Sequence, residues 1–298
     1  MPDLQFRKLR TPEEFRMAEE VQIKAWGMHG EHPVPASLQR AIQDNGGLIL
    51  GAFHDIHLIG FTLGFVAWDG QELYLWSHMN AVLPEYQNHK VGFRLKEAQR
   101  EEVLRMGLPK IRWTFDPLVA KNGYLNVRRL GAYPDRYMHH YYGTMDTEQT
   151  GGIPTDRVRV TWLLTYPHVE ERLGGKVPSK DDDLARFGSS QVLVDTELGE
   201  AGLRIPREVH EPEEGRSSGV LEVPFDMSAL REHQPKDLRG WRLATREAFR
   251  AAHDLGWGVD DFAVVSVEHE RRAFYFLAPR PAEPAPGTPS GADVNPPP

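Results

Sequence analysis

A run of three apolar stretches leading into a helix constrains the fold of this chain most. The three predicted strands are Gly47–Phe53, Phe61–Ala67, where apolar residues alternate, and Leu73–Leu83. His54–His57 turns the first strand back, and Asp69-Gly70 is a hairpin signal between the second and the third. A helix from about Gly92 to Met106 follows, and Gly107 is expected to end it. The pattern predicts an antiparallel meander joined to a helix.

The segments on either side complete one mixed unit. Thr11-Pro12-Glu13-Glu14 is typical of a helix start, Trp26-Gly27 ends that helix, and a shorter helix is predicted over Pro35–Gln43. Downstream we predict a strand, a helix closed by Gly131 and two final strands: Ile111–Phe115, Leu118–Leu130, Tyr137–Tyr142 and Val158–Leu164. The order β-α-α-β-β-β-α-β-α-β-β indicates an α+β fold, a mixed and mostly antiparallel sheet flanked by helices.

Three parts are expected along the chain. Residues 1–170 form the unit just described, and the charged stretch Glu170–Asp183 is interpreted as a linker. Residues 184–278 are predicted to be a small α+β module. Its elements are a strand at Val220–Pro224, a helix at Asp237–Leu255 with Leu255 on its apolar face, and a hairpin of Phe262–Val267 with Ala273–Ala278. Residues 279–298, mostly Pro, Ala, Gly and Ser, are expected to be disordered and dispensable.

Composition excludes several classes of function. With 35 Lys and Arg against 43 Asp and Glu, the net charge of −8 does not favour nonspecific nucleic-acid binding. The absence of cysteine excludes disulfides, thiolate metal ligands and a cysteine nucleophile. The first residues lack the apolar core of a signal peptide, and no apolar run approaches the ~20 residues of a membrane-spanning helix. We therefore expect a soluble, cytoplasmic protein with no membrane partner.

The segment Pro84–Arg100, PEYQNHKVGFRLKEAQR, has the properties of a phosphate-binding loop that opens a helix. A helix N-terminus leaves about four backbone N–H groups unpaired and carries roughly half a positive charge, so a pyrophosphate can accept those groups. The expected donors are the amides of Asn88 to Phe93. Lys90 stands where a glycine would ease the turn, and it would add a cation. The alternative is an ordinary helix start with a surface lysine.

The same residues resemble the GNAT superfamily of acyl-CoA-dependent N-acyltransferases. Val82, Pro84-Glu85-Tyr86-Gln87 and Gly92 match the family's strand–loop–helix motif, whereas Lys90 departs from its first loop glycine. The segment Lys121–Tyr133, with Leu130-Gly131-Ala132, resembles the family's second signature. The resemblance covers about residues 5–165. The local sequences WSHM at residues 76–79 and WTFDPL at 113–118, together with the C-terminal module, resemble a GNAT subgroup of which some members are associated with N-succinylamino acid metabolism.

The resemblance implies a co-substrate, acetyl-CoA or succinyl-CoA, and a set of residues that bind it. Pantetheine would enter between two splayed strands, and a backbone amide from Asn80 to Val82 would polarise the thioester carbonyl. The residues expected to bind the cofactor are Ala81, Val82, Gln87, Asn88, His89, Lys90, Val91, Gly92, Phe93 and Asn122. The alternative role of Asn122, and of Asp116, is helix capping, which is the favoured reading for Asp116.

His78 is the candidate general base. Strand alternation is expected to place it on the same face as Trp76 and Asn80, and an imidazole titrates near neutral pH. An idle strand histidine is the alternative, and Glu72, expected earlier on the strand, is a weaker candidate base. At the position of the family's general acid, a tyrosine, the chain has Val127, so Tyr124 one turn earlier is the displaced candidate.

The acceptor is expected to be the amine of a small molecule, an amino acid, that attacks the acyl group directly in a ternary complex. Trp26, His29 and His32 lie in the connection between the first two helices, and Arg157 precedes the last strand of the first unit. Arg157 could clamp a carboxylate, or it could form a local ion pair with Asp156. Tyr137, Tyr141 and Tyr142 are candidates to line the pocket or to pack.

Three further expectations complete the sequence-based picture. His139-His140 and His29 with His32 have no carboxylate at ligand spacing, so no metal site is expected. The C-terminal module could close over the acceptor or support a homodimer. A GNAT-like protein that binds CoA or another ligand without turnover is the alternative function, since the first loop glycine and the tyrosine are both missing.

Overall fold

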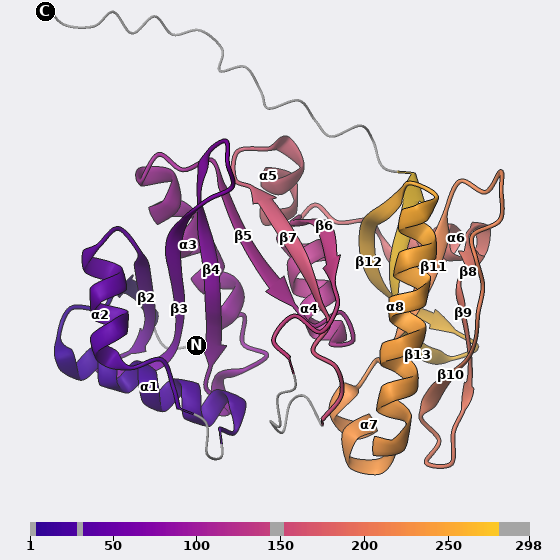
Figure 1. Cartoon of the computed structure of the whole chain (residues 1–298), viewed down its shortest axis with the longest axis horizontal. Coiled ribbons are helices and arrows are strands. Elements are labelled where there is room, and N and C mark those ends of the chain that lie inside the picture. The colour runs from indigo at the N-terminus through magenta and orange to yellow at the C-terminus, as the bar shows by residue number, and fades with distance from the viewer. Residues whose placement is uncertain (1–3, 29–31, 144–151, 280–298) are drawn as a thin grey trace, which may run out of the picture.

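The structure is a computed structural model, and it describes residues 4–28, 32–143 and 152–279 (Figure 1). The expectation for His29 therefore lies outside the described residues, as does that for the tail from residue 280 onward.

The first half of the chain forms a seven-stranded sheet in the order β1-β2-β3-β4-β5-β7-β6. The strands are β1 (Leu4–Lys8), β2 (Leu48–His54), β3 (His57–Trp68), β4 (Leu73–Val82), β5 (Lys110–Phe115), β6 (Tyr133–Met138) and β7 (Arg157–Leu163). Every neighbouring pair is antiparallel except β4 with β5, which run parallel. The predicted α+β class, with a mostly antiparallel sheet flanked by helices, is confirmed.

Helices cover both faces of this sheet (Figure 1). On one face lie α1 (Pro12–Trp26) and α2 (Ala36–Asp44), and the other face carries α3 (Val91–Arg105). As predicted, the Thr11 side chain caps α1 by accepting from the Glu14 N–H, and Gly27 ends it at φ 59°. Two apolar cores result. The α1 core includes Phe15, Val21, Phe61 and Leu63, and the α3 core includes Leu75, Leu95, Val103 and Ile111.

The predicted helix over Leu118–Leu130 is not one regular helix. It consists of α4 (Ala120–Gly123) followed by a π-helical segment, η2 (Tyr124–Arg129), with an i→i+5 bond from the Leu130 N–H to the Leu125 carbonyl oxygen. Gly131 ends it as predicted, at φ 66°. There the Ala132 N–H bonds back to the Asn126 carbonyl and the Gly131 N–H to the Val127 carbonyl.

The predicted strand Tyr137–Tyr142 is wrong by four residues, because β6 begins at Tyr133 and ends at Met138. Pro134 lies inside this strand. A proline is tolerated there because β6 is the edge of the sheet and needs no donor on its outer side. Residues 139–142 form a turn in which His140 takes φ 49°.

The stretch Glu170–Asp183, which we interpreted as a linker from its charges, is partly helical. It contains the end of α5 (Pro167–Leu173) and the start of α6 (Lys180–Ser189). Ser179 and Asp182 form a reciprocal capping box at the start of α6, so part of the charged run is a helix-start signal. Asp183 is buried.

Described residues 191–279 form a second unit of strands and helices. Its elements are β8 (Gln191–Val192), β9 (Val194–Leu198), β10 (Arg204–Val209), β11 (Gly219–Val223), α7 (Met227–His233), η3 (Pro235–Asp237), α8 (Leu238–Asp254), β12 (Trp257–Val267) and β13 (Glu270–Pro279). Four strands pair in the order β12-β13-β11-β8, and β9 and β10 form a separate two-stranded sheet. The predicted strand, helix and hairpin are all present, but Leu255 is 50% exposed and does not join the apolar face of α8.

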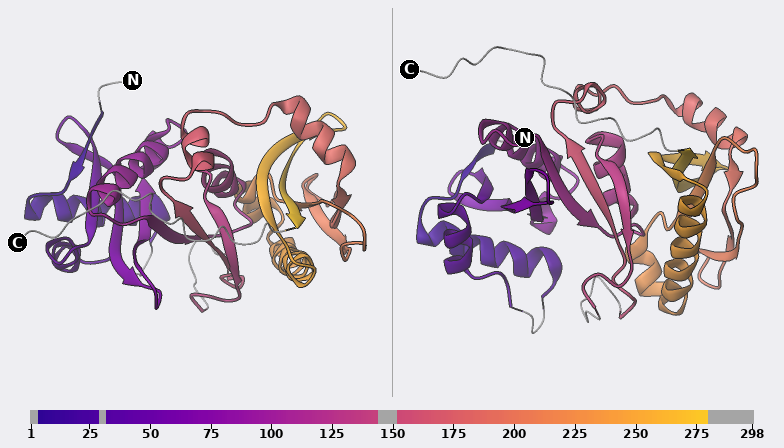
Figure 2. Two further views of the ribbon diagram at one scale, coloured as in Figure 1. Left: turned by 90° about the horizontal axis from the view of Figure 1, so that it is seen from above. Right: turned by 45° about the horizontal axis from the view of Figure 1, so that its top comes forward.

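The two parts of the chain pack against each other through one continuous core, and both figures show them side by side (Figures 1 and 2). Gly123 of α4 lies against the Phe262 ring, where an added Cβ would come within 2.6 Å. The Tyr275 hydroxyl donates to the Pro117 carbonyl oxygen over 3.0 Å. The division into units at residues 170 and 184 stays a prediction. Among the described residues, no helix has the length and apolarity to cross a bilayer.

Candidate active site

A gap between β4 and β5 is the central feature of the first unit. The two strands pair at only two positions, where Leu75–Trp76 faces Ile111–Arg112. Since β4 continues to Val82 and β5 to Phe115, the strands separate toward their carboxyl ends. Past the paired positions, the inner strand edges offer backbone N–H and C=O groups that a ladder would otherwise use.

A β-bulge shapes the β4 side of this gap. Leu63 of β3 pairs with Met79 and Gly64 pairs with Ser77, so His78 is the extra residue. The bulge breaks the alternation along β4. The expectation that His78 and Asn80 share a face is therefore wrong. The His78 ring lies 6.2 Å from that of Phe65, whereas the Asn80 Nδ2 donates to the Gly92 carbonyl oxygen of α3 over 3.3 Å.

Two amides of β4 point into the gap. The Leu83 N–H bonds to the Ile59 carbonyl, on the β3 side. Because successive residues of an antiparallel strand direct their N–H groups to alternate sides, the amides of Asn80 and Val82 face away from β3. The Ala81 amide faces β3. Two of the three expected donors thus have the direction that the predicted role requires.

The loop before α3 has the backbone of a ligand cradle. After the 3-10 turn η1 (Pro84–Tyr86), Asn88 and Lys90 both adopt the left-handed region, at φ 63° and 62°. Lys90 thus holds the conformation for which glycine is best suited. The first intrahelical bond runs from the Arg94 N–H to the Lys90 carbonyl, so the N–H groups of residues 91–93 have no intrahelical acceptor. A phosphate could accept them.

Neighbouring side chains hold this loop against β4. The Gln87 Nε2 donates to the Val82 carbonyl oxygen over 3.2 Å. Asn80 Oδ1 is buried and has no hydrogen-bond partner among the described residues. A buried acceptor without a donor is rare and marks a place for a ligand group or water. A Cβ added to Gly92 would meet its nearest atoms, from Asn80 and Val82, at 3.7 Å, an ordinary van der Waals distance, so the free protein has room for it.

The candidate base and acid lie in different surroundings. His78 is exposed, and desolvation by the atoms around it lowers its pKa from 6.5. Glu72 precedes β4 and forms an ion pair with Lys110, so it is neither on the strand nor free. Tyr124 is 42% exposed at the start of η2, and Asn122 is half-buried in α4. The N-cap of α4 is Val119, so neither Asn122 nor Asp116 caps this helix. Asp116 accepts instead from the Leu118 N–H, in the turn that precedes α4.

On the acceptor side, Trp26 is partly buried against the α1 core. Arg157 does not pair with the carboxylate of Asp156. Its Nη1 lies 3.4 Å from Asp116 Oδ2, at the end of β5, and its guanidinium lies over the Tyr142 ring at 5.4 Å. Tyr137 donates to Asp156 over 2.8 Å, which gives it a structural contact.

The C-terminal module reaches this side of the sheet through arginines of α8. Arg242 bonds to Asp116 over 2.7 Å, and Arg246 holds buried Asp156 through two 2.8 Å bonds. Sequence reasoning did not find these contacts, because 90 residues or more separate the partners. Arginines from the second part of the chain thus hold the carboxylates of Asp116, after β5, and of Asp156, before β7.

A buried lysine at the closed end of the gap was also missed. Lys96 of α3 is 2% exposed and donates to Ser77 Oγ of β4 over 2.8 Å. A signal was available in the sequence, because Lys96 and Gln99 occupy core-facing positions between Leu95 and Val103. A charged side chain at such a position is almost never fully buried unless paired, so it marks a site for inspection.

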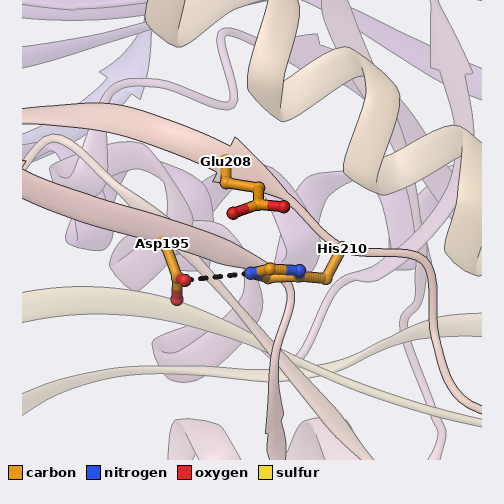
Figure 3. A group of neighbouring side chains, drawn as sticks. All are labelled: Asp195, Glu208 and His210. Atoms are coloured by element: carbon orange, nitrogen blue, oxygen red, sulfur yellow. Dashed lines mark hydrogen bonds and ion pairs between the residues drawn. The ribbon is translucent and has the colours of Figure 1, made fainter.

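Asp195, Glu208 and His210 lie together on the β9–β10 sheet (Figure 3). One potential ligand atom from each lies within 4.8 Å of the others. The grouping arises because a bulge between Pro206 and Glu208 sets Glu208 opposite Asp195. Asp195 and Glu208 are exposed, and the 2.9 Å contact of His210 with Asp195 accounts for the arrangement as an ion pair. The grouping differs from the histidines considered in the sequence.

A cavity of about 460 Å³ lies between β6 and the second part of the chain, where Phe249, Trp257 and Leu277 line it. None of its lining residues belongs to the gap or to the loop before α3. We therefore place the candidate site on the backbone geometry of β4, β5 and α3.

Comparisons with known proteins show what this part of the chain is similar to. Residues 9–122 match the model of the acetyltransferase (GNAT) family. This segment, well under half of the chain, is similar to that family. The segment includes β4, the loop and α3, but ends before η2.

Solved structures with a similar arrangement are acetyltransferases and their relatives. The ribosomal-protein-S18-alanine N-acetyltransferase from Escherichia coli is 18% identical with a TM-score of 0.45, over 55% of this chain and 96% of that one. The protein yncA from Salmonella typhimurium, solved with its cofactor acetyl-CoA, is 16% identical with a TM-score of 0.46, over 55% of this chain and 96% of that one. Arabidopsis thaliana NAA60, in complex with a bisubstrate analogue, is 15% identical with a TM-score of 0.42, over 54% of this chain and 97% of that one. Among curated proteins, none matches the chain.

Proposed function

We propose that the protein is an acyl-CoA-dependent N-acyltransferase that acylates the amine of a small molecule. The observation that carries this proposal is the gap between β4 and β5, which opens at a bulge and directs two amides inward. The family match of residues 9–122 supports an acyl-CoA as the donor. The acetyl group is the first choice of acyl group, and succinyl is the second.

The pyrophosphate of CoA is proposed to bind the amides of Val91, Gly92 and Phe93, with Lys90 as the nearby cation. Asn88 and His89 complete the loop. The pantetheine arm then runs along β4 past Ala81 and Val82, where the unpartnered Oδ1 of Asn80 can accept one of its amide N–H groups. Asn122 of α4 is proposed to border the arm on the other side.

The chemistry is a direct transfer. The neutral amine attacks the thioester carbonyl carbon, and the negative charge that develops on the oxygen is stabilised by an amide of Asn80 or Val82. The C–S bond then breaks and the CoA thiolate leaves. His78 is proposed to take the ammonium proton of the acceptor, through water where the distance requires it. Tyr124 is the candidate donor of a proton to the thiolate, and the proton that the nitrogen loses as the amide forms then restores the tyrosine.

The acceptor is proposed to be an amino acid. Trp26 and Arg157 border the side of the sheet from which it would enter, and the Arg157 guanidinium could bind a carboxylate. Its 3.4 Å contact with Asp116 is long for a charge-assisted bond, so a substrate carboxylate can compete for it. A succinyl group would offer the same chemistry from the donor side.

A specific observation favours a second candidate, a CoA-binding protein without turnover. Lys90 takes the left-handed position of the loop, and buried Val127 stands where the family has its tyrosine. A protein that binds CoA without catalysing acyl transfer could tolerate both of these differences from the family's motif.

One experiment separates the two functions. Acetyl-CoA and succinyl-CoA are each incubated with a panel of L- and D-amino acids, and free thiol release is followed in time. Acceptor-dependent release identifies the acyl group and the amine together. If CoA binds in calorimetry but no acceptor gives thiol release above the hydrolysis rate, the non-catalytic function stands and the transferase is rejected.

A further inference from the structure

The ammonium group of Lys96 fills the closed end of the gap between β4 and β5. It donates to Ser77 Oγ over 2.8 Å and to Gln99 Oε1 over 3.0 Å, and it lies 3.8 Å from the centre of the Trp113 ring. Ser77 and Trp113 are the residues that directly follow the last paired positions of β4 and β5. Lys96 thus contacts both strands at the point where they separate.

The group has neutral partners in place of a counter-ion. Among the described residues, no carboxylate forms an ion pair with Lys96, and only burial acts on its pKa, which falls from 10.5 to about 7. A buried ammonium without a carboxylate is costly, and an apolar side chain of the same length would fill the space at lower cost. A structural need alone does not account for a lysine here.

From Lys96 a directed chain of hydrogen bonds leads to the backbone of the bulge. Gln99 accepts from Lys96 and donates through Nε2 to Thr62 Oγ1 over 3.0 Å. The Thr62 hydroxyl donates in turn to the Met79 carbonyl oxygen over 2.9 Å. Every donor points the same way, and such chains polarise one another.

The chain ends on the peptide unit that joins Met79 to Asn80. The carbonyl oxygen of that unit receives the Thr62 hydroxyl, and its N–H, which belongs to Asn80, points into the gap. A hydrogen bond to the carbonyl of a peptide makes its N–H a stronger donor. The ammonium is therefore linked, through two side chains, to one of the two amides that face the gap.

We propose that Lys96 is a positioning residue for acyl transfer, which acts through Gln99 and Thr62 to orient and strengthen the Asn80 N–H that meets the thioester carbonyl. The inference rests on the proposed transferase function. It adds that the strength of this backbone donor is set by side chains of β3 and α3, on the face of the sheet opposite His78.

The test breaks the last link of the chain without changing the shape of the side chain. Thr62→Val removes the hydroxyl that donates to Met79, and Thr245→Val is the matched control, because Thr245 is also fully buried but its Oγ1 has no partner among the described residues. We expect Thr62→Val to lower kcat with acetyl-CoA by roughly tenfold or more, with KM and the Kd of CoA within about twofold. Thr245→Val should leave kcat unchanged.

Two measurements distinguish this role from a structural one. The amide resonance of Asn80 should shift in ¹⁵N-labelled Thr62→Val and in Lys96→Met, but not in Thr245→Val. The double variant Thr62→Val with Lys96→Met should lose no more kcat than the worse single variant, because both act through one chain. An unmoved Asn80 resonance, or a native kcat in both single variants, overturns the proposal. The resonance is read without turnover, so it tests the chain even if no acceptor is acylated and the transferase function fails.

Discussion

Lys90 adopts a backbone conformation that L-residues rarely take, at φ 62° directly before α3. A left-handed residue with a side chain costs roughly 1–2 kcal/mol, and such strain concentrates where ligands bind. The sequence showed that a glycine was missing here and that a lysine would have to tolerate the turn. The structure agrees, and it adds a second left-handed residue, Asn88, which was not predicted.

Gly92 is expected to matter only when CoA is bound. Gly92→Val should weaken CoA binding at least tenfold, about 1.4 kcal/mol, because the side chain occupies the space next to the loop amides. The free protein has room for the added Cβ, whose nearest neighbours are 3.7 Å away, so the fold should persist. Isothermal calorimetry checks the affinity. Gly188→Val, at another helical glycine with open space around it, is the control, and equal affinities in the two variants would refute the loop assignment.

His78 is expected to control turnover and its pH dependence. His78→Ala should lower kcat by roughly 10²–10⁴-fold, the range for a positioned acid–base group. Since desolvation lowers the pKa of His78 below 6.5, its neutral, proton-accepting form persists to a lower pH than in a free histidine. The rate of the native protein should therefore fall only on the acid side of pH 6.5.

In His78→Ala that acid limb should vanish or move. His57→Ala, at an exposed histidine of β3, serves as the control and should keep both the rate and the limb. If His78→Ala keeps the native turnover per folded molecule and an unchanged pH–rate profile, His78 is not the general base, and a chain of water molecules would have to accept the proton.

At the scale of elements, the sequence predicted correctly those helix ends that depend on nearby residues alone. Thr11, Gly107 and Gly131 mark helix ends through capping and positive φ, and the structure has them there. The bulge at His78 left no local signal, because it depends on how β4 pairs with β3. For the same reason the faces of His78 and Asn80 were misassigned. The place of β6 was also misjudged, and only the strand order shows that it is an edge strand, where Pro134 is tolerated.

Helix α3 combines an apolar face with one buried cation, which makes stability depend on pH. The Lys96 pKa is lowered from 10.5 to about 7, so between these values the unfolded chain binds more protons than the folded one. The free energy of unfolding should then rise as the pH rises from about 7 toward 10.5, and be lowest, as far as this group decides it, below pH 7. Above 10.5 the lysine is neutral in both states.

Urea unfolding of the native protein and of Lys96→Met, measured in parallel from about pH 6.5 to 9.5, isolates this contribution. Groups other than Lys96 cancel in the difference between the two proteins. We expect that difference to rise with pH. A difference that stays flat would mean that the ammonium remains charged in the folded state throughout the range.

For the whole molecule, buried ion pairs join the two parts of the chain. Arg128 of η2 bonds to Asp261 of β12 over 2.6 Å and to Asp183 of α6 over 2.7 Å. None of these contacts could be read from the sequence, because complementary charges more than 50 residues apart have no preferred partner until the fold brings them together.

Arg128→Met is expected to lower the free energy of unfolding by about 3–5 kcal/mol, because it leaves the buried Asp183 carboxylate without its cation and leaves Asp261 with Arg172 alone. Burial already raises the pKa of Asp183, so this carboxyl should take up a proton in the variant. Adding Asp183→Asn should therefore recover part of the loss. Denaturant unfolding gives the values. Arg40→Met, which breaks an exposed pair with Asp44, should cost at most about 1 kcal/mol. Equal losses at the two sites would contradict a buried role for Arg128.

The long reach of these ion pairs has a consequence for the order in which the protein is made. Arg128 is translated 133 residues before Asp261, and Asp116 is translated 126 residues before Arg242. At a synthesis rate of about 5–20 residues per second, the emerging sheet waits roughly 7–27 s for those partners. Until then its charges stay hydrated and the outer side of β6 is uncovered on the ribosome. Strand β12, made long after that sheet, then brings Asp261 to Arg128 and packs beside β6.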